Sequence, residues 1–365
     1  MMILFAFVFW DPNPEVFTIP FLHFPILWYG LLFALGFMLG FPIFVGIVER
    51  FFVQRPDFEE REILGNIELP WLLETTKRGT SSVVKALNEW LVNPKEMVNI
   101  DLSKSKSNLG LSSLHPQEAL RRLKLEQLFP KAILSLRRQA IQITDRLTVY
   151  MVLATVLGAR IGHFVFYEKP SDYLYHPMEL ISIWRMRGLA SHGAAIAIVL
   201  ALGLFAVRYR DKIRGMTWLH LLDFVCVPTA LAGACIRMGN FFNQEILGVP
   251  TTVRWAVIFG HAADGSYPYP RHPVQLYEAI AYAIVFLVLW RLSFFPKYLI
   301  EKGRLLGLFL VLVFGFRFLV EYWKEEQSRI MPGSFNLTMG QLLSIPAVLV
   351  GLFLLFRGFF RYNGK

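Results

Sequence analysis

The residues best suited to chemistry lie in one stretch, Gly233–Gly248, which begins inside an apolar run and ends among polar residues. Its functional side chains are a guanidinium, two amides and a carboxylate, from Arg237, Asn240, Asn243 and Glu245. An arginine near the middle of a bilayer costs roughly 2.5–3.5 kcal/mol on insertion scales, so such a residue usually has a function. Arg237 alone could instead snorkel toward the lipid headgroups. The amides and the carboxylate that follow within two helical turns favour a binding site.

Two more arginines, Arg160 and Arg317, also come late in apolar runs that lead from inside to outside in the topology derived below. Together with Arg237 they are expected in the outer half of the membrane. Independent snorkelling would carry arginines to either side, so three arginines at one level indicate a shared anionic ligand. Guanidinium groups bind phosphate oxygens through two parallel hydrogen bonds, which makes a phosphate the expected ligand.

A histidine is available for acid–base chemistry at the outer end of the third apolar run, where His192 is found. The unperturbed pKa of histidine lies near neutral pH, which suits proton transfer beside a bound phosphate. Tyr29 lies near the outer end of the first run, and Glu321 follows Arg317 by one helical turn. Taken singly, His192 fits a hydrogen-bonding residue at a helix end, and Tyr29 fits the aromatic belt of a membrane interface. Glu321 alone fits a structural ion pair with Arg317. The sequence contains no metal-ligand spacing and no nucleotide-binding loop, so we expect neither a metal nor another cofactor.

The composition places these residues in a membrane protein. Of the 365 residues, 55% are hydrophobic, and 33 are phenylalanine, which is more apolar surface than a soluble domain of this length needs. Several apolar runs reach the roughly 18–20 residues that cross a bilayer as a helix. We predict an all-α membrane protein, a polytopic bundle of about seven transmembrane helices, at residues 26–48, 147–167, 189–207, 218–239, 274–291, 305–322 and 338–357.

The basic residues predict the orientation of the chain. Of the 37 lysines and arginines, 27 fall on one side of the predicted spans and nine on the other. The positive-inside rule then places the N-terminus outside and the C-terminus inside, and it accounts for the net charge of +10 without nucleic acid. We divide the chain into an N-terminal arm with the first transmembrane helix (1–48), a cytoplasmic insert of unassigned role (49–146) and the six remaining helices (147–365). Within the insert, residues 116–143 have the pattern of a basic amphipathic helix, suited either to an anionic membrane surface or to a small folded insert.

The types of these polar residues and their order along the chain resemble those of the bacterial prolipoprotein diacylglyceryl transferases. Gly233–Gly248 is similar to the family signature Gly-Arg-x-Gly-Asn-Phe-x-Asn-x-Glu, which is followed by a glycine. Further blocks similar to those of the family occur in the family's order: Trp28-Tyr29-Gly30, Gly158–Gly162, Ser191–Gly193, His272–Glu278, Phe316–Glu321 and Met339–Pro346. The resemblance covers the predicted spans and leaves the insert unassigned.

The resemblance implies that the diacylglyceryl group of phosphatidylglycerol is transferred to the lipobox cysteine thiol of preprolipoprotein signal peptides, where it forms a thioether. It implies the bacterial inner membrane, an active site toward the outer leaflet, and membrane lipids rather than nucleic acid as surroundings. From the residues and the resemblance together, we expect catalytic roles for Tyr29, His192, Arg237 and Arg317. We expect substrate binding by Arg160, Arg237, Asn240, Asn243, Glu245, Gly248 and Glu321.

Three departures from the family pattern bear on the site. Cys235-Ile236 interrupts the signature, where small glycines are more usual. Ala194 stands where a second glycine is usual after Ser191-His-Gly, and Val313 stands where a tyrosine is expected. Tyr277 and Tyr322 are candidates to replace that tyrosine. The alternative function is a transporter or translocase of an anionic lipid headgroup, which predicts polar residues at both membrane levels. The polar blocks of this sequence concentrate at the outer level, which favours the transferase.

Overall fold

The computed structural model describes residues 7–21, 24–54, 136–167, 190–210, 215–325 and 337–362. The chain forms two compact units, one of Met1–Phe44 with Leu219–Lys365 and the other of Val45–Trp218. Most of the predicted insert, including residues 116–135 of its predicted amphipathic helix, lies outside the described residues. The division into an arm, an insert and a six-helix remainder therefore stays a prediction.

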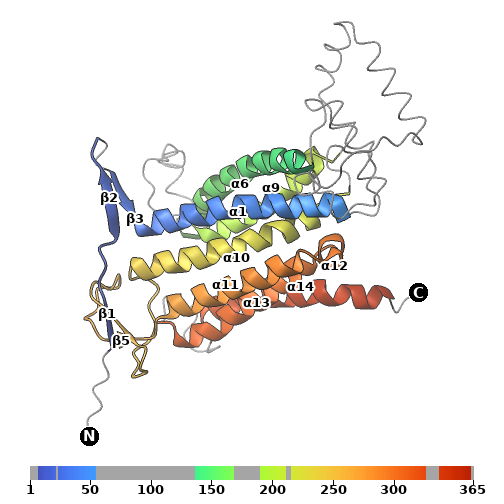
Figure 1. The fold of residues 1–365 in the computed structure, drawn as a ribbon. Coiled ribbons are helices and arrows are strands. Elements are labelled where there is room, and N and C mark those ends of the chain that lie inside the picture. The colour runs from blue at the N-terminus through green and yellow to red at the C-terminus, as the bar shows by residue number, and fades with distance from the viewer. Residues whose placement is uncertain are drawn as a thin grey trace, which may run out of the picture. The chain divides into compact units, whose positions relative to one another are not determined.

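A helix occupies each of the seven predicted spans (Figure 1). These helices are α1 (Trp28–Gln54), α6 (Leu136–Tyr167), α9 (Ser191–Arg208), α10 (Trp218–Phe242), α11 (Val274–Leu292), α13 (Arg304–Val320) and α14 (Met339–Tyr362). Two short elements, α12 (Pro296–Ile300) and the 3-10 helix η2 (Glu321–Trp323), flank α13. Six helices in the described part of the chain are long and apolar enough to cross a membrane, and α9 is shorter. The prediction of an all-α polytopic membrane protein is confirmed.

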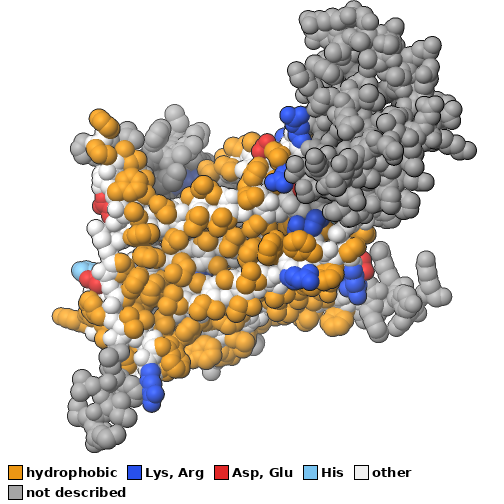
Figure 2. Space-filling model, viewed as in Figure 1, with side chains coloured by type: hydrophobic (Ala, Val, Ile, Leu, Met, Phe, Trp, Pro, Cys, Tyr) orange, Lys and Arg blue, Asp and Glu red, His pale blue; other side chains and the backbone are white. Residues whose placement is uncertain are grey.

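The flanks of the helices have the surface expected of membrane-spanning segments. Figure 2 shows hydrophobic side chains over these flanks and lysines and arginines near helix ends. On α9, Leu200 and Leu204 are 68% and 62% exposed, and on α14 Phe353 is 68% exposed. Lipid tails are as apolar as these side chains, so their exposure is not a cost in a bilayer.

The structure also has short strands that were not predicted. Strands β1 (Val8–Trp10), β4 (Val257–Phe259) and β5 (Pro270–Arg271) form one small sheet, in which β1 runs parallel to β4. Strands β2 (Glu15–Ile19) and β3 (Phe24–Leu27) form an antiparallel pair, so α1 begins only at Trp28. The Trp10 indole donates to the Phe241 carbonyl at 3.1 Å, and the two rings pack in a tilted arrangement with their centres 4.6 Å apart, which fixes the N-terminal arm to the end of α10.

Helix α10 is joined to α13 by a buried carboxylate. Asp223 is fully buried, and its oxygens accept the backbone N–H groups of Gly303 at 2.5 Å and Leu306 at 2.7 Å. These donors belong to the first turn of α13, where backbone N–H groups lack partners within the helix. Because Arg237 lies on α10 and Arg317 on α13, this contact helps to set the spacing of the two helices that carry them.

In the second unit, α6 and α9 pack at very close range through glycines. A Cβ atom placed on Gly193 would lie 2.5 Å from the Cα of Gly162 and would also meet the carbonyl oxygen of Gly158. The N–H of Ala190 donates to the carbonyl of Ala159 at 2.9 Å. Small residues four positions apart let helix backbones approach in membranes. The same helix pair carries Arg160 on α6 and His192 on α9.

We expect Gly193→Ala to lower the Tm, because the added methyl group would meet backbone atoms that cannot turn aside. Overpacking of this kind costs about 1–3 kcal/mol. Gly203, also on α9, is the matched control, since its nearest atom, Nε1 of Trp218, would be 3.7 Å from an added Cβ. Gly203→Ala should leave the Tm unchanged or raise it through helix propensity. Thermal unfolding of both purified variants compares them, and an equal Tm for the two would contradict the close packing.

Candidate active site

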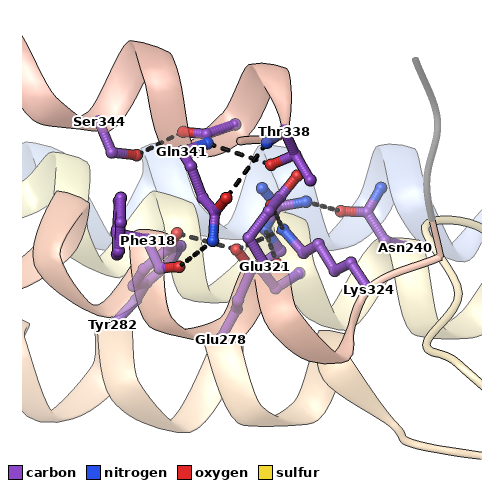
Figure 3. A network of polar contacts seen from close by, with 11 residues as sticks. Asn240, Glu278, Tyr282, Phe318, Glu321, Lys324, Thr338, Gln341 and Ser344 are labelled. Atoms are coloured by element: carbon purple, nitrogen blue, oxygen red, sulfur yellow. Dashed lines mark hydrogen bonds and ion pairs between the residues drawn. The ribbon is translucent and has the colours of Figure 1, made fainter. Parts of the chain in front are cut away.

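A buried carboxylate on α11 holds two cations from other parts of the first unit. The Nε atom of Arg237 lies 3.0 Å from Oε2 of Glu278, and Nζ of Lys324 lies 2.9 Å from its Oε1. Glu278 is fully buried, and the side chains of Arg237 and Lys324 are only 13% and 8% exposed. Figure 3 shows Glu278 and Lys324 pointing toward one another, with Glu321 beside them. We call Arg237, Glu278 and Lys324 the ionic cluster.

Glu278 lies on the face of α11 that packs against α10. The helix begins at Val274, directly after Pro273, which is its N-cap residue. Tyr282 follows Glu278 by one turn on the same face and donates its hydroxyl to Oε1 of Glu278 at 3.2 Å. The Tyr282 ring also lies against Gly233 of α10, where an added Cβ would be 3.3 Å from it.

Arg317 lies near this cluster and has a guanidinium without an assigned partner. The Tyr282 hydroxyl is within electrostatic range of both Arg237 and Arg317. Among the residues that the structure describes, the Arg317 side chain makes no hydrogen bond or ion pair. Glu321 contacts Lys324 instead, at 3.6 Å between Oε2 and Nζ, so the structural Arg317–Glu321 pair considered from the sequence does not form. No described residue occupies the five N–H donors of Arg317, which suits this arginine to bind a ligand.

Four residues of the predicted signature form a continuous chain of hydrogen bonds. Arg237 donates from Nη1 to Oδ1 of Asn240 at 3.1 Å, and Asn240 donates from Nδ2 to Oε1 of Glu245 at 2.7 Å. Asn243 donates to the same Glu245 oxygen at 3.4 Å. Arg237 and Asn240 are three residues apart on α10, so their side chains share one helix face. The spacing in the sequence predicted this proximity.

Tyr29, the first residue after Trp28 at the start of α1, joins the same group. A Cβ on Gly239 would lie 2.7 Å from Cδ2 of Tyr29, so the glycine is what allows the tyrosine ring to rest on α10. The phenol is within electrostatic range of Glu245 and Arg237. The structure thus brings Tyr29 to the predicted site, although Tyr29 and Arg237 are far apart in the sequence.

Two glycines in the predicted blocks make room for site residues. A Cβ on Gly248 would overlap the carbonyl of His272, and Gly248 forms a β-bridge with Lys324 that brings this lysine to Glu278. A Cβ on Gly340 would lie 2.5 Å from Oε1 of Glu321 and 2.6 Å from Oε2. Gly248 thus has a packing role in the site.

The start of α14, next to Gly340, is fixed by a capping box. The Gln341 N–H lies 3.3 Å from Oγ1 of Thr338, and the Thr338 N–H donates to Oε1 of Gln341 at 3.1 Å. Gln341 also donates from Nε2 to the Phe318 carbonyl of α13 at 3.5 Å, as Figure 3 shows. These bonds hold Gly340 against Glu321.

Neither tyrosine proposed to replace the one missing at Val313 contacts the ionic cluster. The Tyr277 hydroxyl accepts from the Trp255 indole at 2.7 Å and lies 3.1 Å from Nδ1 of His272. Tyr322 is 64% exposed. Tyr282 is the tyrosine whose hydroxyl binds Glu278, and it was missed from the sequence because its position in an apolar helix is equally typical of a core residue.

Arg271 is an arginine with a structural role, because its guanidinium group is bound by other side chains. It is 1% exposed, donates to Asp264 at 3.0 Å and Ser266 at 2.6 Å, and pairs with Glu325. Its guanidinium carbon also lies 4.1 Å from the centre of the Tyr269 ring. With its donors occupied, Arg271 has little capacity for a ligand, in contrast to Arg317.

The remaining predicted site residues belong to the second unit. His192 is exposed in the first turn of α9. The Arg160 guanidinium on α6 lies 4.5 Å from the centre of the Phe164 ring. Within that unit, the close packing of α6 and α9 brings the segments carrying these two residues to the same end of the helix pair.

Apolar helices with arginines, amides and carboxylates gathered near helix ends are typical of an integral membrane enzyme that handles an anionic lipid group. Comparison with known proteins gives the family, because the family model described as prolipoprotein diacylglyceryl transferase matches residues 125–357. The chain belongs to the prolipoprotein diacylglyceryl transferase family.

Individual relatives agree with this assignment. The chain is 37% identical over 360 residues to the phosphatidylglycerol–prolipoprotein diacylglyceryl transferase of Protochlamydia amoebophila, covering 96% of this chain and 95% of that one. It is 43% identical over 211 residues to the enzyme of the same name from Tolumonas auensis, covering 58% and 77%. It is 42% identical over 212 residues to that from Chloroherpeton thalassium, covering 57% and 74%.

Proposed function

We propose that this chain transfers the diacylglyceryl group of phosphatidylglycerol to the lipobox cysteine of preprolipoproteins. Membership of the family and the names of its relatives support transfer from phosphatidylglycerol to a prolipoprotein, a step in lipoprotein maturation. The single structural observation that carries the proposal is that Arg237, paired with Glu278, and Arg317, which has no partner among the described residues, both lie within electrostatic range of the Tyr282 hydroxyl.

The two arginines hold the lipid phosphate and stabilise the charge that it gains as it leaves. Arg317 offers its planar fork to two phosphate oxygens. Arg237 is oriented by Glu278 and Asn240, which use its Nε and Nη1 atoms and leave Nη2 for the ligand. Donors that are already in place when charge develops lower the barrier without reorganisation.

The bond changes balance without a further reactant. The lipobox thiolate attacks the glycerol carbon that carries the phosphate ester; the carbon–sulfur bond forms as the carbon–oxygen bond breaks. The electron pair of the broken bond leaves with glycerol phosphate. Since the thiolate and not the thiol is the nucleophile, a base takes the thiol proton, and His192 and Glu245 are the two candidates.

We place this site toward the outer leaflet of the bacterial inner membrane, on the strength of the positive-inside rule. The expected result is that a membrane-impermeant thiol reagent added outside labels Tyr267→Cys and spares Ile100→Cys, in a chain whose own Cys226 and Cys235 are replaced. Tyr267 is 90% exposed, so the reagent has access to it. The control is labelling after permeabilisation, which should modify both. Labelling of position 100 and not of 267 in intact cells would invert the topology.

We expect Gly340→Ala to reduce transfer while leaving the fold intact. The methyl group would displace the Glu321 carboxylate, which pairs with Lys324, and a displacement of about 1 Å near reacting groups can cost up to roughly 100-fold in rate. Gly315→Ala on α13 is the matched control, because nothing lies within 4 Å of its added Cβ. Rates of transfer to a lipobox peptide and Tm values are compared; equal rates for the two variants would remove Glu321 from the reaction.

The function itself is tested with purified protein, phosphatidylglycerol and a lipobox peptide. The expected product is a peptide heavier by one diacylglyceryl group, formed only when the lipobox cysteine is present and absent with a serine peptide. A translocase would instead move labelled phosphatidylglycerol across a vesicle bilayer and leave the peptide unmodified.

A further inference from the structure

The turn that follows α10 presents Glu245 between two strained residues. Gln244 and Ile246 have φ angles of 53° and 57°, and neither is a glycine. Positive φ is uncommon for residues with a side chain, and for a β-branched residue such as isoleucine it is a true outlier. Such strain persists where surrounding contacts enforce it, and it gathers at functional sites. The contacts that enforce it here involve the N-terminal arm.

Every hydrogen-bonding group of Gln244 is used. Its side chain donates from Nε2 to Oδ1 of Asp11 at 3.0 Å and accepts the His261 N–H at Oε1, at 2.7 Å. Its own N–H donates to the Phe241 carbonyl at 3.2 Å, and its carbonyl accepts the Ala263 N–H at 3.0 Å. The residue is only 3% exposed. A glutamine fixed at all four groups has no alternative conformation that keeps these bonds.

Asp11 is held in place from two directions. Its Oδ1 atom also lies 2.6 Å from Nδ1 of His261, and the hydrogen bond from this ring lowers the pKa of the Asp11 carboxyl. The Gly260 N–H donates to the Trp10 carbonyl at 3.0 Å, and Gly260 has no side chain that would collide with Asp11. The pairing of β1 with β4 therefore sets the position of the carboxylate that binds Gln244.

Glu245 itself is fixed by its backbone as well as by its neighbours. Its N–H donates to the Asn240 carbonyl at 3.0 Å, and its carbonyl accepts Nε2 of Gln275 at 2.7 Å. The backbone on its N-terminal side depends on Gln244. Rotation there would carry the Glu245 carboxylate away from Asn240 and Asn243.

We infer that Asp11, Gln244 and the backbone N–H of His261 form a clasp that positions the Glu245 carboxylate for the reaction. Asp11 and Gln244 act through Glu245 and do not touch the substrate. The inference rests on the proposed function, in which Glu245 belongs to the active site. It assigns the N-terminal arm, which lies outside the residues matched by the family model, a part in catalysis.

The test compares Asp11→Ala, Gln244→Ala and the double variant in steady-state transfer to a lipobox peptide. Each single variant should lower kcat by roughly 10–100-fold, the effect of a misplacement of about 1 Å, with KM nearly unchanged. The double variant should be no worse than the worse single variant, because both changes open one clasp. Asp11→Asn, which keeps the accepting oxygen, should restore most of the turnover. Thr18→Ala removes a different hydrogen bond in the arm and should transfer at the wild-type rate.

A second measurement decides the inference without reference to activity. Hydrogen–deuterium exchange at residues 243–247 should be faster in Asp11→Ala and unchanged in Thr18→Ala. Unaltered exchange in Asp11→Ala, wild-type kcat in both single variants, or multiplied losses in the double variant would each overturn the clasp. Absence of transfer by the unaltered protein would remove the proposed function instead, and the exchange measurement would still decide whether the clasp orders the turn.

Discussion

Replacement of Arg237 or Arg317 by lysine should reduce diacylglyceryl transfer by roughly 10²–10³, the loss of about 2.7–4 kcal/mol that follows removal of one donor to a developing anion. Lysine keeps the charge but is a point donor, so it cannot present two N–H groups to two phosphate oxygens. At position 237 it also cannot bind both Glu278 and Asn240, which contact different nitrogens of the arginine. The loss should appear mainly in kcat, since these donors act on the transition state.

The measurement is transfer to a lipobox peptide by each purified variant, with the amount of protein and the Tm determined in parallel. Arg291→Lys is the matched control, because Arg291 is in the last turn of α11 and lies over the Phe295 ring at 4.8 Å. It should transfer at the wild-type rate. Near-normal rates for both site variants would mean that the two arginines only orient or anchor helices, since a snorkelling lysine reaches the headgroups equally well.

Glu278→Gln should produce the largest loss of stability among single changes in the site. Glu278 is fully buried, and its neutralisation leaves Arg237 without its ion-pair partner and Lys324 with only the longer contact to Glu321, at 3.6 Å. Removing one member of a buried ion pair costs about 3–5 kcal/mol. Burial lowers the pKa of Lys324, because its ammonium loses water, and the charge of Glu278 opposes this effect.

The double variant Glu278→Gln with Lys324→Met separates this explanation from a general loss of packing. Removing the charge of Lys324 as well should recover part of the Tm lost in Glu278→Gln, since a buried cation that has lost its closer partner is gone. Transfer should stay low in both variants, because Arg237 has lost the carboxylate that orients it. A double variant that melts below the single variant would show that charge balance is not what Glu278 supplies.

The part of the site that could be predicted is the part that is local in the sequence. Arg237 and Asn240 are one turn apart on α10, so their spacing predicted that they meet, and Glu245 follows in the turn after the helix. Glu278 and Lys324 come from α11 and from the residue after η2, and apolar helices give no periodic signal of which face turns toward which neighbour. A charged residue inside the predicted fifth span was nevertheless a signal, because ionisable residues within membrane segments are rarely idle.

The elements of the fold, like the residues of the site, were predicted where the signal is local in the sequence. Hydropathy located all seven helices, since a run of apolar residues suffices to predict a span. It placed the start of the second span at residue 147, whereas α6 begins at Leu136, because its first turns are polar; residues 136–143 had been predicted as part of the amphipathic helix 116–143. The strands were not predicted, for a different reason. β1 pairs with β4 across most of the chain, and three-residue strands carry too little alternation to be recognised.

The most direct test of the central claim counts both products of one reaction. Purified protein in bilayers of phosphatidylglycerol is given a lipobox peptide, and the thioether adduct and the released glycerol phosphate are measured in the same sample. We predict equal amounts of the two products with the unaltered protein, and neither product above background with Arg237→Lys or Arg317→Lys. Glycerol phosphate without adduct, adduct in equal amounts from the lysine variants, or no product from the unaltered protein would contradict the account.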